Sequence, residues 1–237
     1  MTSGDANWDK LWRQGFTYGP LDGWAREIFL TIGELLEDCD SPSILSAGCG
    51  RGLIDYWILE ALGCRVTLLD NSMQCIKNLK KLLRKVEGGR YEIVYGSIQD
   101  IHFPNRSFDL VWNEGALEHF HEADYRRAFR EMVRVARRYV LTDVPNANCR
   151  PYILVKEWVD AHGKWSWGYE QPRGSLRQDL EDCGVQLLSE KSIGGHRTIM
   201  NYLDMVPFEH RQGILNRLEP EDFETFPHLL TIGVLDV

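Results

Sequence analysis

Short runs of apolar residues alternate along the chain with longer stretches in which apolar residues recur every three or four positions. The short runs predict β-strands and the longer stretches predict amphipathic helices, because these spacings place the apolar side chains on one face of each element. Strands are expected at 44–47, 65–69, 91–95, 108–113, 139–144, 185–191 and 229–237. Helices are expected at 22–37, 54–62, 73–86 and 175–183. The alternation predicts a doubly wound, parallel α/β sheet with helices on both faces.

The turn after the first of these strands is rich in glycine. Gly48, Gly50 and Gly52 remove side chains where the backbone must turn sharply, so that a ligand can lie against peptide N–H groups at the start of a helix. The next strand ends in Asp70, whose carboxylate can accept hydrogen bonds from both hydroxyls of a ribose. These features predict a nucleotide-binding unit. The glycine spacing is G-x-G-x-G, whereas dinucleotide-binding folds favour G-x-G-x-x-G.

A second motif follows farther along the chain. Residues 95–104 contain a Gly-Ser turn and an apolar-Pro step, and residues 108–119 run from Phe-Asp into Leu-Glu-His. The two motifs, in this order and at this distance, resemble the signatures of the class I S-adenosylmethionine-dependent methyltransferases, in particular their small-molecule branch. The resemblance covers about residues 41–143. It implies a Rossmann-like, mainly parallel seven-stranded sheet with an antiparallel last strand, and S-adenosylmethionine as the cofactor.

The resemblance also implies which residues surround the cofactor. The glycine loop would pass under its methionine part, Asp70 would hold the ribose, and Met73 would pack on the adenine. Arg13 would meet the methionine carboxylate. The implied set is Ser46, Gly48, Cys49, Gly50, Gly52, Asp70, Asn71, Met73, Ser97, Ile98, Asn113, Arg13 and Tyr18.

Two positions depart from the family pattern. Ser46 stands where most members carry an acid that helps to fix the methionine amino group, and Ser97 replaces an acid that accepts a hydrogen bond from the adenine amino group. A serine hydroxyl can accept a hydrogen bond but carries no charge. We therefore expect either weaker cofactor binding or, at Ser46, another carboxylate that compensates.

The composition favours one domain that acts on a small molecule. The 237 residues, 43% of them hydrophobic, suit a single α/β domain over 1–237 with insertions. The net charge of −8 argues against nucleic acids and membrane surfaces as partners. The six cysteines form no C-x-x-C pair, which predicts no metal site and fits a reducing compartment. With no export signal or long apolar segment in the sequence, we expect a cytoplasmic monomer or homodimer.

Segments outside the core are expected to cover the site. Residues 41–144 would form the cofactor-binding core, and 1–40 a helical lid in which Trp12 or Tyr18 closes over the cofactor; a helix docked on the sheet is the alternative. Segments 145–174 and 193–227 are longer than a minimal fold needs, and we interpret both as cover over the substrate. The aromatic residues near Trp167 would line a pocket for a flat or cationic substrate, or else pack the insert onto the sheet.

Two residues are candidates for a role in the chemistry. Methyl transfer is an in-line displacement, so alignment and exclusion of water supply much of the rate and a base is optional. His119 is the first candidate for a base because its pKa range suits proton transfer at neutral pH, although it can instead brace a helix. Glu114 lies just past the fourth strand and would orient an amine, whereas His102 and His228 are expected to be structural.

The predicted function is transfer of a methyl group from S-adenosylmethionine to a small-molecule acceptor, with S-adenosylhomocysteine as the product. Whether the acceptor atom is O, N, S or C stays open. One alternative is a non-catalytic cofactor-binding or regulatory protein, which Ser46 and Ser97 suggest. The other is an NAD-dependent oxidoreductase, which the glycine spacing disfavours.

Overall fold

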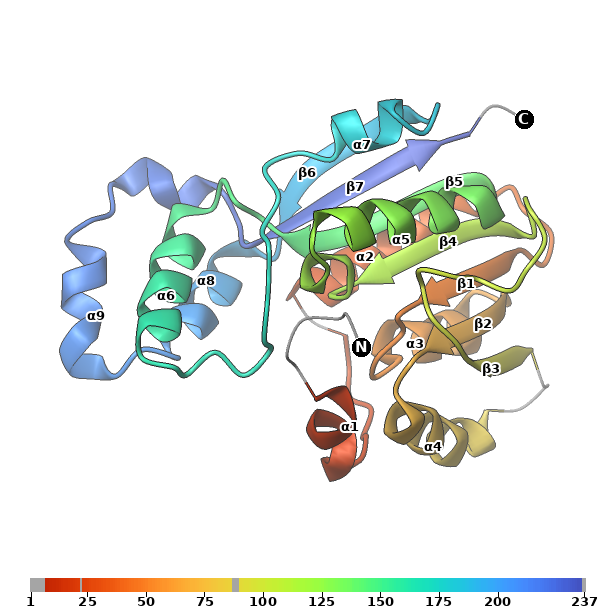
Figure 1. Cartoon of the computed structure of the whole chain (residues 1–237), viewed down its shortest axis with the longest axis horizontal. Coiled ribbons are helices and arrows are strands. Elements are labelled where there is room, and N and C mark those ends of the chain that lie inside the picture. The colour runs from red at the N-terminus through yellow and green to blue at the C-terminus, as the bar shows by residue number, and fades with distance from the viewer. Residues whose placement is uncertain (1–6, 22, 87–89, 236–237) are drawn as a thin grey trace.

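The computed structural model describes residues 7–21, 23–86 and 90–235, and its centre is one seven-stranded sheet (Figure 1). The strand order is β3-β2-β1-β4-β5-β7-β6. The neighbours run parallel except for β7, which pairs antiparallel with both β5 and β6. The predicted sheet with its antiparallel last strand is therefore confirmed. The strands are β1 (Ser43–Ala47), β2 (Arg65–Asp70), β3 (Tyr91–Tyr95), β4 (Phe108–Glu114), β5 (Ala136–Pro145), β6 (Gln186–Ile193) and β7 (His228–Val234).

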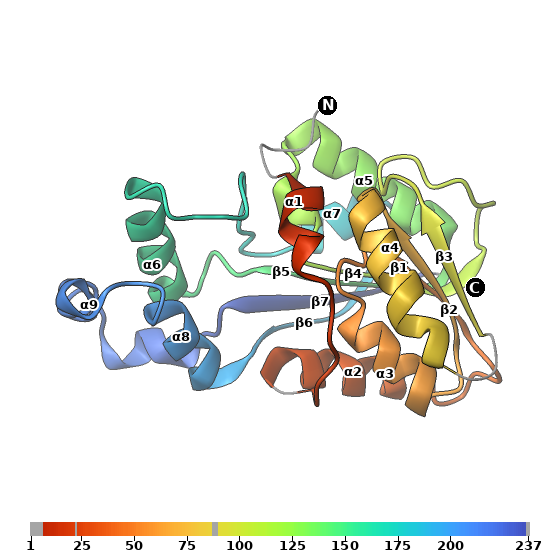
Figure 2. The ribbon, with the colours of Figure 1, turned by 90° about the horizontal axis from the view of Figure 1, so that it is seen from below.

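Helices cover both faces of this sheet, as the alternating pattern predicts (Figure 2). One face packs in a single apolar cluster with α2 (Gly23–Leu35), α3 (Leu53–Ala61) and α4 (Met73–Leu82). The other face packs with α5 (Glu122–Val135) and α7 (Arg177–Glu181). Most of the side chains facing the sheet are aliphatic, and burying each one stabilises the fold by ~1.5–3 kcal/mol.

Some boundaries differ from the expected ones. The helix expected at 73–86 ends at Leu82 and continues as the 3₁₀ turn η2 (Leu83–Lys85). Strand β5 begins three residues earlier than expected, at Ala136, which pairs with Phe108. The apolar pattern does not predict this earlier start, because position 137 is a polar arginine. Its guanidinium lies at the surface and pairs with Asp109 at 2.9 Å. Asp22 and residues 236–237 of the expected elements lie outside the described residues.

The two long inserts form a helical layer at one end of the sheet (Figure 1). It consists of α6 (Arg150–Ala161), α8 (Gly195–Leu203), α9 (Phe208–Leu215) and the 3₁₀ helix η4 (Pro220–Glu224). These helices share an apolar cluster of their own, centred on Tyr152, Val155 and Ile199. Their position beyond the end of β5 places them beside the carboxyl ends of the central strands, where ligands bind in open α/β sheets.

The N-terminal segment lies against α4 (Figure 2). It forms α1 (Trp8–Leu11) and the 3₁₀ turn η1 (Trp12–Gln14). The Asp9 carboxylate accepts hydrogen bonds from the Ser72 hydroxyl at 2.6 Å and the Gln74 backbone N–H at 3.0 Å. Asn78 donates to the carbonyl of Trp12 at 2.6 Å. Among the described residues, no helix is long and apolar enough to cross a membrane.

Candidate active site

The glycine loop after β1 needs glycine for both conformation and space. Gly48, Gly50 and Gly52 have φ angles of 73°, 49° and 60°, which L side chains adopt only at a cost. A Cβ atom on Gly48 would lie 2.7 Å from the Cβ of Ala116. The N–H groups of Gly48 and Cys49 donate to the carbonyl of Leu69 at 2.8 and 3.0 Å. The loop is therefore held closely between β2 and the segment after β4.

Asp70 stands at the end of β2 beside this loop and is 8% exposed. Its two carboxylate oxygens accept backbone hydrogen bonds, one from Gly50 at 2.9 Å and one from Ser72 at 2.8 Å. Burial raises the pKa of Asp70, and the hydrogen bonds from Ser72 and Gly50 oppose that rise. Each oxygen keeps a lone pair for a further donor, so the carboxylate is oriented and can still hold a ribose.

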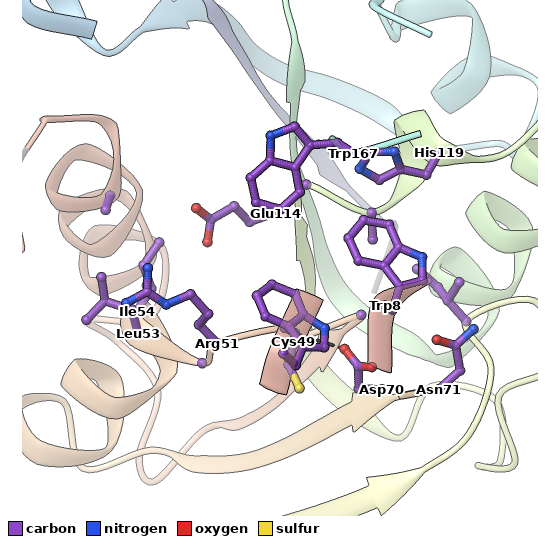
Figure 3. Close-up of a pocket in the computed structure, with 18 of the residues that line it drawn as sticks. Trp8, Cys49, Arg51, Leu53, Ile54, Asp70, Asn71, Glu114, His119 and Trp167 are labelled. Carbon is purple, nitrogen blue, oxygen red and sulfur yellow. Dashed lines mark hydrogen bonds between the residues drawn. The ribbon is translucent and has the colours of Figure 1, made fainter. Parts of the chain in front are cut away.

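A cavity of about 430 Å³ opens above the loop and the ends of the central strands. Figure 3 shows Glu114, His119 and Trp167 on one side of it and Cys49, Asp70 and Asn71 on the other. Its volume falls in the usual range for small-molecule and cofactor sites. The lining combines backbone groups, the carboxyl groups of Asp70 and Glu114 and apolar surface, which fits a nucleoside with a polar tail. It consists of Trp8, Trp12, Trp24, Ala25, Gly48, Cys49, Gly50, Arg51, Gly52, Leu53, Ile54, Asp70, Asn71, Gly96, Ile98, Glu114, Gly115, Ala116, His119, Phe120 and Trp167.

The predicted cofactor residues divide into two groups. Seven of them line the cavity, namely Gly48, Cys49, Gly50, Gly52, Asp70, Asn71 and Ile98. Six are not among its lining residues, namely Ser46, Met73, Ser97, Asn113, Arg13 and Tyr18.

The residues outside the lining have other surroundings. Tyr18 stacks on Tyr56 behind the loop, with ring centroids 4.3 Å apart. Asn113 donates to the carbonyl of Ala47 at 2.7 Å and so joins β4 to β1. Arg13 and Met73 are exposed, and the Ser97 hydroxyl accepts from the N–H of Gln99 at 3.2 Å. Their predicted roles toward the cofactor stay predictions.

Ser46 is paired with a carboxylate from the next helix. Its hydroxyl donates to Asp55 at 3.0 Å, and Trp112 Nε1 donates to the other oxygen of Asp55 at 3.2 Å. Asp55 is 1% exposed, and burial raises its pKa to about 7. A carboxyl group therefore lies beside Ser46, but it is not among the residues that line the cavity. Through its two hydrogen bonds, the Asp55 carboxyl group on α3 links β1 to β4.

A second cavity of about 340 Å³ adjoins the first. The two share Trp24, Glu114, Gly115, His119 and Trp167 in their linings. The second cavity is further lined by Glu118, Asp143, Val144, Pro145, Trp165, Glu170, Thr198, Asn201, Tyr202, Met205 and His228. Residues from both inserts are in this list, which supports the interpretation of the inserts as cover over a substrate.

Glu114 and His119 form part of the shared wall. Glu114 accepts a hydrogen bond from Trp24 Nε1 at 3.0 Å, and burial together with Asp143 raises its pKa to about 7.

His119 belongs to a 3₁₀ turn, η3 (Leu117–His119), rather than to the following α-helix. Its Nδ1 lies 2.7 Å from the carbonyl of Tyr169. Because a carbonyl only accepts hydrogen bonds, Nδ1 carries the proton and Nε2 keeps a lone pair. Burial lowers the pKa of His119, which favours this neutral form.

In the part of the chain that the structure describes, two groups of side chains have a spacing that could hold a metal ion. In Cys49, Asp70 and Cys75, one ligand atom from each residue lies within 4.8 Å of the others. Burial raises the pKa of the Cys49 thiol well above its ordinary value, and a neutral thiol is a poor ligand. The second group is Glu118, His119 and Glu170.

Several residues of the site were not identified from the sequence. Trp24 is one of the regularly spaced apolar residues of the helix expected at 22–37, a pattern that predicts packing against the sheet rather than a site. Arg51 occupies a variable position within the glycine motif. His228 was expected to be structural, yet it lines the second cavity and lies 2.9 Å from Asp143. A signal for Asp143 was available, because an acid inside an apolar strand near its carboxyl end often marks a site.

Comparison with known proteins agrees with this geometry. Residues 44–138 match the family model described as a methyltransferase domain. The chain is 26% identical over 148 residues to a sarcosine/dimethylglycine N-methyltransferase of Halorhodospira halochloris, covering 60% of this chain and 51% of that protein. It is 29% identical over 94 residues to a glycine/sarcosine/dimethylglycine N-methyltransferase of Actinopolyspora halophila, covering 39% of this chain and 16% of that protein. The match thus spans about half of the length of the first of these curated relatives and 16% of the second.

Among solved structures, the magnesium protoporphyrin IX methyltransferase of Synechocystis PCC 6803, with bound S-adenosylhomocysteine, superimposes with a TM-score of 0.66. The identity is 14%, and the match covers 96% of this chain and 94% of that one. This similarity supports the fold, while the family match supports the identity of the glycine-loop domain. Residues 44–138 thus resemble a methyltransferase domain in sequence, and the chain has the fold of a solved methyltransferase.

Proposed function

We propose that this protein transfers the methyl group of S-adenosylmethionine to a small-molecule acceptor bound in the second cavity. The observation that carries the proposal is the shared wall: a cavity with the glycine loop and Asp70 adjoins a second cavity, and Glu114 and His119 line both. Two adjoining sites allow a donor and an acceptor to meet in line, which supplies much of the rate of a displacement.

S-adenosylmethionine supplies a methyl group on a positively charged sulfur, which is a good leaving group. Within the chain, Asp70 and the glycine loop would hold the nucleoside and the methionine backbone. Arg51 is exposed, lines the cavity and lies close enough to Glu114 to lower the pKa of that carboxyl. We assign Arg51, rather than Arg13, to the methionine carboxylate, because a guanidinium binds a carboxylate through two parallel hydrogen bonds.

The N-terminal segment would close the site. The ring of Trp8 lies 4.8 Å from that of His119 and 6.5 Å from that of Trp167, and Trp12 stacks behind it at 6.1 Å. These rings line the first cavity, and their closure over a bound cofactor would exclude water and strengthen electrostatic interactions inside. The positive φ of 75° at Gly15 provides a turn on which this segment can move.

Glu114 and His119 are the groups available for proton transfer from an acceptor. The raised pKa of Glu114, near 7, and the Nε2 lone pair of His119, 3.9 Å from the carboxyl group of Glu118, both suit a base at neutral pH. The N-methyltransferase names of the two relatives favour an amine as the acceptor. A cytoplasmic location and a monomeric or homodimeric state stay predictions from the sequence.

The test is turnover with S-adenosylmethionine that carries an isotopically labelled methyl group. Pools of amines, alcohols, thiols and carboxylic acids are screened by mass spectrometry for the label. We expect labelled product from at least one pool and a loss of ~10²-fold or more in rate for Glu114→Gln or His119→Gln. Glu157→Gln serves as the control, because Glu157 is an exposed residue of α6 that lines neither cavity. Tight S-adenosylhomocysteine binding without acceptor-dependent turnover in any pool would instead support the regulatory alternative.

A further inference from the structure

Among the described residues that line the second cavity, carboxyl groups outnumber basic side chains. Four carboxyl groups line it, those of Glu114, Glu118, Asp143 and Glu170. Burial raises the pKa of Glu118 well above its ordinary value, and the nearby charges of Glu170, Asp143 and Glu114 raise it further. Gathering acids in a buried site is unfavourable unless a cation or hydrogen-bond donors compensate.

Two of these carboxyl groups have an oxygen with no partner. Glu118 is 3% exposed and Asp143 is 1% exposed, and neither Glu118 Oε2 nor Asp143 Oδ1 makes a hydrogen bond to any residue that the structure describes. Since buried polar atoms are nearly always paired in folded proteins, two such oxygens beside one cavity indicate that a ligand completes them. This observation is independent of the number of acids.

The basic side chains near the cavity are already engaged. His228 lies 2.9 Å from Asp143 Oδ2 and stacks on Trp24, with ring centroids 4.7 Å apart. Burial alone would lower the pKa of His228, but the Asp143 carboxylate outweighs it and the pKa is raised. Lys156 Nζ pairs with Asp160 at 2.7 Å. No Lys or Arg is among the described residues that line this cavity.

The walls between the acids are aromatic. Trp24, Trp165, Trp167 and Tyr202 line the cavity, and aromatic ring faces attract cations. A volume of about 340 Å³ is far more than a bare metal ion needs and suits an organic molecule. Acids with unpaired oxygens, aromatic walls and the absence of a lining Lys or Arg together favour an organic cation.

We propose that the second cavity binds the methyl acceptor as an organic ammonium ion that carries no carboxylate, with the ammonium held by Glu118 and Asp143 between aromatic walls. This inference rests on the proposed function.

The ammonium first gives its proton to the Glu114 carboxylate. The freed nitrogen lone pair then forms a bond to the methyl carbon while the carbon–sulfur bond breaks and its electron pair stays on sulfur. The product is a more substituted ammonium ion and a neutral thioether.

The experiment is calorimetric titration of the wild-type protein, with and without saturating S-adenosylhomocysteine, using three probes of similar size. Choline is the cation, 3,3-dimethylbutan-1-ol is its uncharged isostere, and dimethylglycine is an amine that carries a carboxylate. We expect choline to bind at least about 10-fold more tightly than the other two probes, because the paired charge and the aromatic walls both favour the cation. Glu118→Gln should weaken choline binding by about 10-fold while S-adenosylhomocysteine binding is unchanged, and Glu157→Gln should alter neither.

The other outcomes of this experiment would overturn either this proposal or the proposed function. Equal binding of choline and its isostere, or tighter binding of dimethylglycine, would overturn the proposal. So would stoichiometric binding of Mn²⁺ that Glu118→Gln abolishes, in a protein that does not bind choline, because the cluster of Glu118, His119 and Glu170 would then belong to a metal ion. If Glu118→Gln does not fold, the comparison of probes on the wild type decides alone. A failure of S-adenosylhomocysteine to bind would refute the proposed function, whereas the choline preference is measured separately without it.

Discussion

Replacement of Asp55 by Asn gives the most quantitative test of the buried structure beneath the glycine loop. Asp55 is 1% exposed and accepts hydrogen bonds from Ser46 and Trp112. An Asn at this position keeps the shape, since its carbonyl can accept from Trp112 Nε1 and its amide can donate to the Ser46 hydroxyl. The substitution removes the titration and leaves most of the packing.

The sign and size of the effect follow from the pKa of Asp55. That pKa is 3.8 in its ordinary state and about 7 in the folded protein, so between these values the folded state binds more protons than the unfolded state. The free energy of unfolding of the wild type therefore falls as the pH rises through this window. The slope is ~1.36 kcal/mol for each pH unit well below the folded pKa and falls near it, so the loss from pH 5 to pH 8 amounts to about 3 kcal/mol. The Asp55→Asn variant has no titrating group at this position, so its free energy of unfolding does not fall for this reason.

Urea unfolding followed by tryptophan fluorescence at pH 5, 6, 7 and 8 measures this difference. We expect the stability of Asp55→Asn relative to the wild type to increase by about 3 kcal/mol from pH 5 to pH 8. Asp38→Asn, at an exposed aspartate, should follow the wild type at every pH. Stability curves of Asp55→Asn and wild type that run parallel from pH 5 to pH 8 would refute the assignment of a buried, largely protonated carboxyl at Asp55.

Three further predictions concern the cofactor cavity. Arg51→Gln should weaken S-adenosylhomocysteine binding by about 10-fold, because it removes a charge-assisted pair, and should leave the affinity for adenosine unchanged; equal losses for both ligands would contradict the assigned role. Asp9→Asn should increase proteolytic cleavage within residues 7–14 of the cofactor-bound protein, since it weakens the anchor of α1 on α4; unchanged cleavage would argue against the lid. Gly48→Ala should destabilise the fold by ~1–3 kcal/mol more than the control Gly163→Ala. Both glycines have a positive φ, but only a Cβ added at position 48 would meet a neighbouring atom. Equal melting temperatures of the two variants would exclude that contact.

The parts of the fold that could be predicted are those whose signals are local. The strand, glycine turn and helix at 44–62 follow one another without interruption, so spacing alone identifies the loop. Asp70 could be placed because the carboxyl ends of parallel strands meet at one edge of the sheet. The conformational demands on Gly48 and Gly52 are likewise properties of a short segment.

The rest of the site depends on residues that are far apart in the sequence. Asp143 and His228 meet only because β7 returns antiparallel beside β5. Glu170 reaches the second cavity on an insert whose path no local pattern specifies. Ser46 was identified as a departure from the family pattern, but its partner Asp55 is a single acid within an otherwise ordinary helix, and the sequence offers no reason to single it out.

The central claim is that the glycine loop and Asp70 bind S-adenosylmethionine rather than a dinucleotide, and calorimetric titration with S-adenosylhomocysteine and NAD tests it most directly. We predict that S-adenosylhomocysteine binds the wild type with 1:1 stoichiometry and that NAD does not bind. Asp70→Asn should weaken S-adenosylhomocysteine binding by about 10- to 100-fold, as expected for loss of a charge-assisted hydrogen-bond pair. Binding of NAD in preference to S-adenosylhomocysteine, or unaltered S-adenosylhomocysteine affinity in Asp70→Asn, would contradict the account.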